Sequence, residues 1–406
     1  MRMPWILRMT IMAAILSAPL FFYVGRRLST AITNRFKISK KITLSFVFAV
    51  ILWYYLYPIT IMVFHLNGSI RSLFVFKPGL HWPDYLLLYP FWWGFICLLE
   101  TVSFFALLDI FTLISRLKIV PYPVKTKWRN TQEFLKIGLV LFFLVYVGAR
   151  IYIDTNQVRI NTHNITIQNL PEEFQNLHIG FFGDIHADRY TKNKKLEKLE
   201  KFVHSGKEDL LLFSGDLISN GKSYVKQTLK IIGGPKAGTA SIACMGDHDF
   251  WTDSRGIPGQ MEAHGWTFLQ DEHRLLPYKG KKILVTGITH IYSKRISKHE
   301  LKKLLSRAPA AGLKILLVHQ PREMLVEAAA EYGYHLLLGG HTHGGQIVPH
   351  LFGIPLNVNR EETPFVNGRY LYNGLHVVIT NGIGLTLAPV RYHAPAEITR
   401  IVLERN

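Results

Sequence analysis

Cysteine is nearly absent from this sequence. Only Cys97 and Cys244 occur among 406 residues, and no Cys-x-x-Cys pair is present. Cys97 lies in an apolar stretch and Cys244 at the end of a predicted strand. The scarcity argues against a disulfide scaffold and against thiolate metal sites, and it gives no indication of the redox compartment. Internal repeats and low-complexity tracts are also lacking.

Acidic residues are scarce as well, above all near the N-terminus. Residues 1–155 hold 17 of the 47 Lys and Arg but only 5 of the 28 Asp and Glu. The formal charge of +19 would by itself suggest a nucleic-acid or anionic-membrane partner. Because most of the excess flanks apolar segments, membrane topology explains it better, and we expect no nucleic-acid partner. The mild excess on residues 156–406 would favour an anionic substrate or lipid headgroups.

Long apolar runs fill the first 155 residues. Four of them approach or exceed the roughly 20 residues needed to cross a bilayer: Trp5–Val24, Ile42–Phe64, Tyr85–Ile114 and Phe134–Gly148. A buried soluble bundle would need polar faces at helical spacing, which these runs lack. A cleaved signal peptide is disfavoured because apolar residues continue past Ala18 to Phe22. We therefore predict about four transmembrane helices in residues 1–150 of a multi-pass membrane protein.

The loops between the runs predict the orientation. Six basic residues separate the first run from the second. Five separate the third from the fourth, with Lys136 at the start of the fourth, whereas the middle loop has only Arg71 and Lys77. Positive loops stay in the cytoplasm. Four spans would then place the C-terminal part outside the cytoplasm, in our interpretation on the outer side of the cell (inner) membrane. One helix more or fewer would reverse this prediction.

Two acids, Glu100 and Asp109, fall inside the third run, where a charge is costly and often marks function. The structural alternative places Asp109 near the interface and pairs Glu100 with a neighbouring helix, and we give it more weight. A transporter or channel would need more intramembrane charges than these.

Residues 156–406 repeat one arrangement, in which a short apolar run is followed at once by Gly, Asp or His. The runs are Leu177–Phe182, Leu210–Phe213, Ala240–Met245, Ile315–Val318 and Leu336–Leu338. Such runs are typical of buried strands, and helical patterns occur between them at Lys194–His204 and Pro321–Tyr332. The alternation predicts an α/β domain that gathers ligand groups at the carboxyl ends of its strands.

The residues at these strand ends are oxygen and nitrogen donors. Asp and His are rarely buried unless they are paired or bound to a metal. Each motif alone would more often be structural, but five at successive strand ends favour a metal site. Carboxylate and imidazole ligands suit Mn²⁺, Fe or Zn²⁺ better than Ca²⁺ or Cu(I).

Taken together, the motifs resemble those of calcineurin-like metallophosphoesterases. Five motifs carry the resemblance in order: Gly183-Asp184-Ile185-His186, Gly215-Asp216, Gly246-Asp247-His248-Asp249, His319 and His341-Thr342-His343. The ending, which includes Asn381-Gly382-Ile383-Gly384, is similar to that of small bacterial phosphodiesterases and their membrane-bound relatives. The resemblance implies a four-layer αββα sandwich over residues 176–406, reached through a linker at 151–175.

The same resemblance implies a ligand set. One metal ion would be bound by Asp184, His186, Asp216 and His343, and a second by Asp216, Asp247, His319 and His341, so that Asp216 bridges. Two divalent or mixed-valence ions about 3.5–4 Å apart would hold a hydroxide that attacks phosphorus in line. His248 would protonate or stabilise the leaving oxygen. No further cofactor site is expected.

Two residues depart from the family pattern. The family usually has Asn in place of Asp247, and the extra carboxylate would make the metal centre about neutral, so we expect an altered metal preference. Ser219 stands where many members have an acid that can orient the catalytic histidine. Either another group then orients His248 or His248 is less well positioned, and Asp249 and Asp253 are acids nearby in sequence.

The leading hypothesis is a metal-dependent phosphodiesterase or phosphatase at a membrane surface. The anchor favours an amphiphilic substrate, such as a phospholipid or a lipid-linked sugar diphosphate, and a broad-specificity phosphodiesterase is an equal candidate. The alternative is a non-catalytic scaffold or sensor that keeps the metal-binding fold. It rests on Asp247 and Ser219, and the complete ligand set disfavours it. The sequence does not indicate the oligomeric state.

Overall fold

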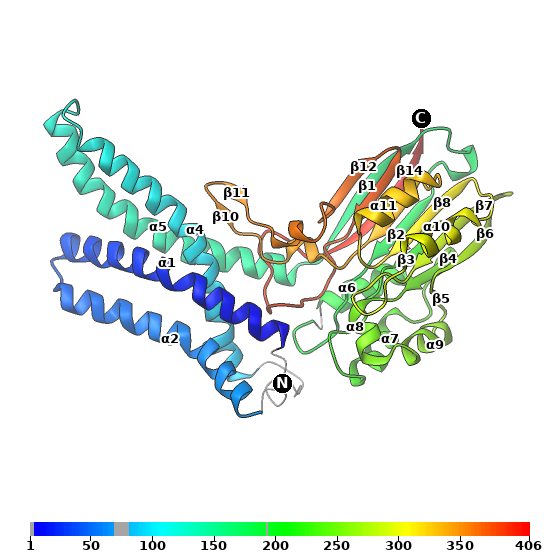
Figure 1. The fold of residues 1–406 in the computed structure, drawn as a ribbon, viewed down its shortest axis with the longest axis horizontal. Coiled ribbons are helices and arrows are strands. Elements are labelled where there is room, and N and C mark those ends of the chain that lie inside the picture. The colour runs from blue at the N-terminus through cyan, green and yellow to red at the C-terminus, as the bar shows by residue number, and fades with distance from the viewer. Residues whose placement is uncertain (1–3, 69–80, 192–193) are drawn as a thin grey trace. The chain divides into compact units, whose positions relative to one another are not determined.

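The computed structural model describes residues 4–68, 81–191 and 194–406. The chain divides into two compact units (Figure 1). The first comprises Met1–Ile153 with the later segments Val348–Leu356 and Leu387–Tyr392, and the second comprises Asp154–Ile347, Asn357–Thr386 and His393–Asn406. The grouping of the two later segments with the N-terminal helices was not anticipated from the sequence.

Long apolar helices dominate the first unit. They are α1 (Trp5–Phe36), α2 (Lys40–Leu66), α4 (Tyr89–Ser115), preceded by the π-helical turn η1 (Asp84–Leu88), and α5 (Tyr122–Asn156). Among the described residues, four helices are long and apolar enough to cross a membrane. This confirms four long apolar helices where four spans were predicted, although α1 and α5 extend well beyond their apolar runs. The predicted loop residues Arg71 and Lys77 lie outside the described residues.

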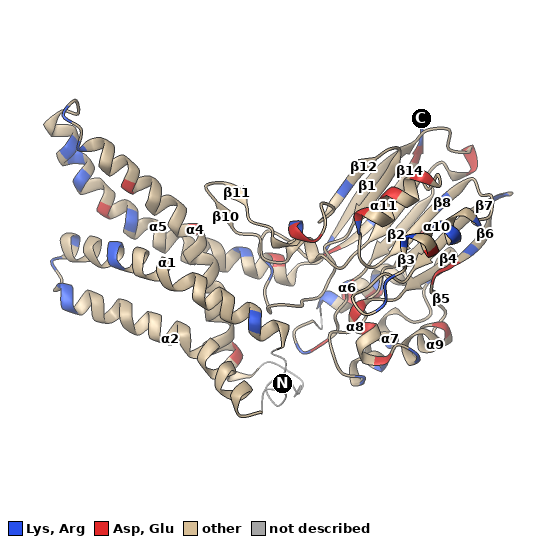
Figure 2. Ribbon diagram, viewed as in Figure 1, with Lys and Arg blue, Asp and Glu red and all other residues tan. Residues whose placement is uncertain are grey.

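Many basic residues of this unit gather near helix ends, whereas the acids Glu100 and Asp109 lie within α4 (Figure 2). Figure 2 shows Lys and Arg where α1 meets α2 and where α4 meets α5. Asp109 accepts a hydrogen bond from the Tyr23 hydroxyl at 2.7 Å and pairs with Arg27 at 2.7 Å. The carboxylate of Asp109 therefore has partners on α1, which fits the structural alternative. Glu100 is bonded not to a neighbouring helix but to the two later segments of the unit, as described below.

The second unit contains two six-stranded sheets. The first has the strand order β1-β14-β2-β3-β4-β5 and the second β12-β13-β9-β8-β7-β6. The strands of the first sheet are β1 (Arg159–Ile167), β2 (His178–Phe182), β3 (Glu208–Phe213), β4 (Ala237–Cys244), β5 (Thr267–Leu269) and β14 (Glu397–Arg405). Those of the second are β6 (Glu272–Tyr278), β7 (Lys281–Ile288), β8 (Leu313–Val318), β9 (Leu336–Gly339), β12 (Gly368–Tyr372) and β13 (Leu375–Ile379).

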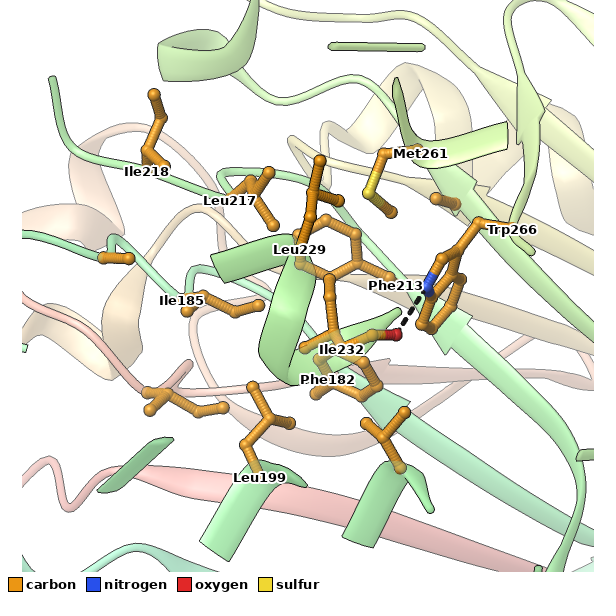
Figure 3. Packing of buried hydrophobic residues seen from close by; sticks show 14 of the residues in the cluster. Phe182, Ile185, Leu199, Phe213, Leu217, Ile218, Leu229, Ile232, Met261 and Trp266 are labelled. Carbon is orange, nitrogen blue, oxygen red and sulfur yellow. Dashed lines mark hydrogen bonds between the residues drawn. The ribbon is translucent and has the colours of Figure 1, made fainter. Parts of the chain in front are cut away.

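Helices cover the outer faces of the two sheets. They are α6 (Lys194–Val203), α7 (Ser223–Ile232), α8 (Asp247–Asp253), α9 (Gly256–Ala263), α10 (Lys298–Ser306) and α11 (Glu323–Glu331). Successive residues of a strand point to opposite faces. Phe181 accordingly joins the apolar cluster between the sheets, while Phe182 packs under α6 and α7 with Trp266 (Figure 3). Helices α10 and α11 cover the outer face of the second sheet. These layers confirm the predicted αββα sandwich.

The remaining short elements are 3-10 turns and one hairpin: η2 (Glu172–Phe174), η3 (His343–Gly345), η4 (Val358–Glu361), β10 (His350–Leu351) and β11 (Ile354–Pro355). Strands β2, β3 and β4 run parallel, as do β7, β8 and β9. The carboxyl ends of each parallel set therefore lie at one edge of their sheet.

Candidate metal centre

The predicted ligands all follow the carboxyl ends of strands. Asp184 and His186 come after β2, Asp216 after β3, Asp247 after β4, His319 after β8, and His341 and His343 after β9. The structure brings the seven side chains, and His248 with them, into four overlapping groups of three that could hold a metal ion: Asp184, His186 and His343; His186, Asp216 and His248; Asp247, His319 and His341; and Asp184, Asp216 and His319. The distances between donor atoms are described below for two groups of four ligands that share Asp216.

Four donor atoms make up the first group. Nε2 of His186 lies 3.2 Å from Oδ2 of Asp216 and 3.9 Å from Oδ1 of Asp184. Nε2 of His343 lies 3.2 Å from Nε2 of His186 and 3.4 Å from Oδ1 of Asp184. All four side chains are buried, so the donors face one enclosed point.

The second group is built in the same way. Nε2 of His319 lies 3.3 Å from Oδ2 of Asp216 and 3.3 Å from Oδ2 of Asp247. Nδ1 of His341 lies 3.2 Å from the same oxygen of Asp247. Nδ1 of His319 lies 2.8 Å from the carbonyl oxygen of Ser214 and can donate its proton there, which leaves Nε2 for a cation.

One oxygen, Oδ2 of Asp216, belongs to both groups, while its Oδ1 accepts the backbone N–H of His248 at 2.8 Å. Two ligands about 2.1 Å from a shared ion, at angles of roughly 90–110°, lie roughly 3.0–3.4 Å apart. Six of the seven separations between donors are 3.2–3.4 Å. The donor chemistry and the spacing therefore fit two ions that share the Asp216 carboxylate.

The backbone at the site adopts a conformation that side chains rarely take. Five candidate ligands have positive φ: Asp184 (49°), His186 (42°), Asp216 (60°), His341 (69°) and His343 (51°). Each such residue costs about 1–3 kcal/mol, and backbone strain of this kind clusters at functional sites. The backbone of residue 246 also lies so close to Asp216 that only glycine fits, because a Cβ on Gly246 would lie 2.2 Å from Oδ1 of Asp216.

Buried charges of opposite sign balance one another here. Burial alone would raise the pKa of Asp216, but the imidazoles of His319, His248 and His186 hold it well below its usual range. Burial would lower the pKa of His319, yet Asp216 and Asp247 raise it well above its usual value. Cation binding requires neutral imidazoles, so it would release protons from this cluster.

Asp247 occupies surroundings that suit a carboxylate. Its Oδ1 accepts the backbone N–H of Tyr292 at 2.7 Å, and its Oδ2 accepts Nε2–H of Gln320 at 2.7 Å. Both oxygens thus face donors. A carboxamide would turn its NH₂ group toward one of them, which gives a physical reason for Asp rather than Asn at this position.

His248 is oriented by the backbone rather than by an acid. Its Nδ1 lies 2.5 Å from the carbonyl oxygen of Ser219, to which it can donate, leaving Nε2 free. Asp249 instead accepts the N–H groups of Asp216 and Leu217, and burial together with Asp216 raises its pKa to about 7. Asp253 pairs with Lys222. The main-chain carbonyl of Ser219 therefore orients the ring of His248.

Two exposed aromatic rings border the site. Trp251 is 49% exposed and its ring lies 4.9 Å from that of His248, while Tyr292 is 46% exposed and lies 5.3 Å from the ring of His341. The two rings are nearly parallel, with centroids 6.5 Å apart. A substrate bound at the donor groups would meet these rings.

The sequence did not identify every residue that supports the site. Oε1 of Glu362 lies 3.3 Å from Nε2 of His341, accepts the Tyr292 hydroxyl at 2.7 Å and pairs with Arg322. Burial would raise the pKa of Glu362, but the hydrogen bond with His341 lowers it to about 2. Glu362 lies in a loop without a motif, so no signal marked it. His290 is buried but belongs to none of the metal-compatible groups found among the described residues.

Comparisons with known proteins agree with this geometry. Residues 177–345 match the family described as calcineurin-like phosphoesterase. An uncharacterized metallophosphoesterase, YkuE of Bacillus subtilis, is 26% identical over 63% of this chain and 89% of its own length. A transmembrane protein with metallophosphoesterase domain from Danio rerio is 26% identical over 77% of this chain and 73% of its own. An uncharacterized metallophosphoesterase of Helicobacter pylori strain J99 is 24% identical over 68% and 72%.

Proposed function

Since this chain carries a calcineurin-like metallophosphoesterase domain in a membrane protein, we propose that it hydrolyses phosphodiester or lipid-linked pyrophosphate bonds at a membrane surface. The observation that carries the proposal is the sharing of Oδ2 of Asp216 by two groups of donors spaced for cations. Neither group contains a thiolate, and carboxylate with imidazole suits Mn²⁺, Fe or Zn²⁺.

In the proposed ligand set, Asp184, His186, Asp216 and His343 bind one ion, and Asp216, Asp247, His319 and His341 bind the other. When bound, such a pair neutralises phosphoryl charge and supplies a water-derived nucleophile at neutral pH. Hydrogen bonds hold the ligands in place: Nδ1 of His319 can donate to the carbonyl oxygen of Ser214, and Nε2 of His341 to the carboxylate of Glu362. That preorganisation lets charge develop on the phosphoryl oxygens without rearrangement of the protein.

His248 would assist the leaving group. The Ser219 carbonyl fixes the ring through Nδ1, and the backbone N–H of His248 is tied to Asp216. Its Nε2 can therefore carry a proton to an oxygen that leaves phosphorus near the shared carboxylate. Trp251 lies beside this ring, so the leaving group would rest against an aromatic face.

The membrane side follows from the loop charges. Basic residues cluster in and beside the connection from α1 to α2 and the connection from α4 to α5 (Figure 2), and positive segments of this kind remain cytoplasmic. We therefore assign the hydrolase domain to the outer side of the cell (inner) membrane.

The alternative of a non-catalytic scaffold or sensor rested on two departures from the family pattern, Asp247 and Ser219, and both have a structural explanation. Asp247 is matched to the donors around it, and the Ser219 carbonyl orients His248. Neither departure from the family pattern leaves a catalytic group without its partner.

The test uses the full-length protein in detergent with bis-p-nitrophenyl phosphate. We expect turnover that requires Mn²⁺, Fe²⁺ or Zn²⁺ and that falls about 10²–10⁴-fold in His248→Ala, the usual contribution of an acid–base residue. His204→Ala is the matched control, because its Nδ1 also contacts a backbone carbonyl but outside the site. Full activity of His248→Ala would refute the acid role, and no turnover with any of these metals would refute the hydrolase proposal.

A further inference from the structure

The β10–β11 hairpin exposes large parts of its apolar side chains. Phe352 is 53% exposed, Ile354 66% and Leu356 37%. Residues 347–359 include no Asp, Glu, Lys or Arg. Water-exposed loops are normally polar, and a contiguous exposed apolar group marks an interaction surface.

The hairpin belongs to the membrane unit and is bonded to a spanning helix. The backbone N–H of His350 donates to Oε1 of Glu100 at 2.9 Å, and that of Phe352 donates to Oγ of Ser103 at 3.1 Å. Both acceptors lie within α4, and the hairpin segment Val348–Leu356 groups with α4 in one compact unit.

The second segment of this unit shares the same anchor. The hydroxyl of Tyr392 donates to Oε1 of Glu100 at 2.9 Å. Glu100 is 5% exposed, and a carboxylate within a membrane span requires partners of this kind. Leu356 N–H closes the hairpin onto the carbonyl of Pro349 at 2.8 Å. These bonds provide partners for backbone groups that lipid could not satisfy.

We propose that the tip of the hairpin, Phe352 to Leu356, lies in the lipid bilayer, and that the enzyme acts on amphiphilic phosphoesters whose tails share that bilayer. The first part rests on the hairpin alone, and the second also rests on the proposed function. The hairpin is hydrogen-bonded to α4, a helix long and apolar enough to cross a membrane, which makes acyl chains the occupant that we assign to its apolar tip. Only Gly344–Ile347 separate His343 from the hairpin segment, so a ligand-bearing loop and the lipid-seated tip form one short stretch of chain.

The first test measures the depth of the tip directly. A nitroxide is attached to Phe352→Cys or Ile354→Cys in the full-length chain in phosphatidylcholine–phosphatidylglycerol vesicles. Cys97 and Cys244 are buried, and labelled wild-type protein gives the background. Leu371→Cys is the matched control, because Leu371 is 68% exposed on β12 in the hydrolase unit.

We expect labels at 352 and 354 to collide several-fold more with oxygen, relative to a water-soluble nickel chelate, than the label at 371. An equal ratio at all three positions would place the tip in water and overturn the proposal. Low collision with both reagents would place the tip against protein, whether a second copy or another partner, and would also overturn it.

The second test concerns the substrate class. Wild type, Phe352→Ser/Ile354→Ser and Leu371→Ser are assayed on a fluorescent phospholipid in vesicles and on bis-p-nitrophenyl phosphate. We expect the ratio of vesicle to soluble kcat/KM to fall at least tenfold in the hairpin variant and to hold in the control. An unchanged ratio, or wild type that cleaves only the soluble substrate, would overturn the amphiphile assignment. If neither substrate is cleaved, the proposed function fails, while the spin-label result still decides where the tip lies.

Discussion

Replacement of Asp247 by Asn removes a charge and one hydrogen-bond acceptor at a defined place. The amide can keep its oxygen toward His319 and His341, as the usual family residue would. Its NH₂ group then faces the backbone N–H of Tyr292, which now lies 2.7 Å from Oδ1. In the opposite orientation the NH₂ group faces the cation site and cannot act as a ligand.

The contacts of Asp247 allow the size of both effects to be estimated, the lost hydrogen bond and the changed charge of the metal centre. When the amide NH₂ group faces the buried N–H of Tyr292, one hydrogen bond is lost and a buried donor is left unpaired. This lowers the free energy of unfolding by about 1–3 kcal/mol. For a domain of this size that lowers Tm by about 2–4 °C per kcal/mol. The charge of a centre with two divalent ions and one hydroxide changes from about neutral to about +1. We expect the weaker ion's Kd to rise about tenfold or more, equivalent to about 1.4 kcal/mol, with a changed order of activating metals.

The assay combines calorimetric titration of the metal-free full-length protein with Mn²⁺, Fe²⁺ and Zn²⁺ and thermal unfolding of the same samples. Asp271→Asn is the matched control, because Asp271 also accepts a backbone N–H at 2.7 Å, from Thr289, but lies outside the donor groups. The control should leave metal binding unchanged. If Asp247→Asn shows the wild-type metal profile and the wild-type Tm, the role assigned to this carboxylate is wrong.

Three further predictions concern Glu362, the bound metal and Trp266. Glu362→Gln should weaken metal binding about 10–100-fold, since partners that orient a ligating histidine have that effect, and an unchanged titration would show that His341 needs no such partner. A chelator should destabilise the metal-loaded protein by about 2.7 kcal/mol if the ion was at a hundred times its Kd, and thermal unfolding before and after metal is restored would detect it. Trp266→Ala should cost about 3–5 kcal/mol, because the ring packs on Phe182 and donates to the Ile232 carbonyl at 2.9 Å (Figure 3). Leu371→Ala, on an exposed position, should change the free energy of unfolding little by comparison.

The strands and candidate ligands of the second unit could be predicted from the sequence because the patterns that indicate them are local. Each buried strand is a short apolar run, and each candidate ligand follows one directly, as Asp184 follows β2 and His319 follows β8. The carboxyl ends of parallel strands meet at one edge for topological reasons. The order of strands and polar residues therefore predicted that these residues gather at one metal site, while the division of the ligands between two ions came from the resemblance to calcineurin-like metallophosphoesterases.

The supporting contacts were not predictable, because they depend on tertiary structure and often on the main chain. The group that orients His248 is a carbonyl, which any residue at 219 would provide. Glu100 finds its partners about 250 and 290 residues away, in His350 and Tyr392. Hydropathy also indicates the apolar length of a span rather than the end of its helix. For this reason the sequence did not predict that α1 continues to Phe36.

Elemental analysis of purified full-length protein by inductively coupled plasma mass spectrometry tests the central claim, two ions joined through one carboxylate, most directly. The account predicts close to two equivalents of Mn, Fe or Zn per chain, falling to one or fewer in Asp216→Ala and unchanged in Asp271→Ala. Active protein without stoichiometric metal, or an Asp216→Ala variant that retains both ions, would contradict it.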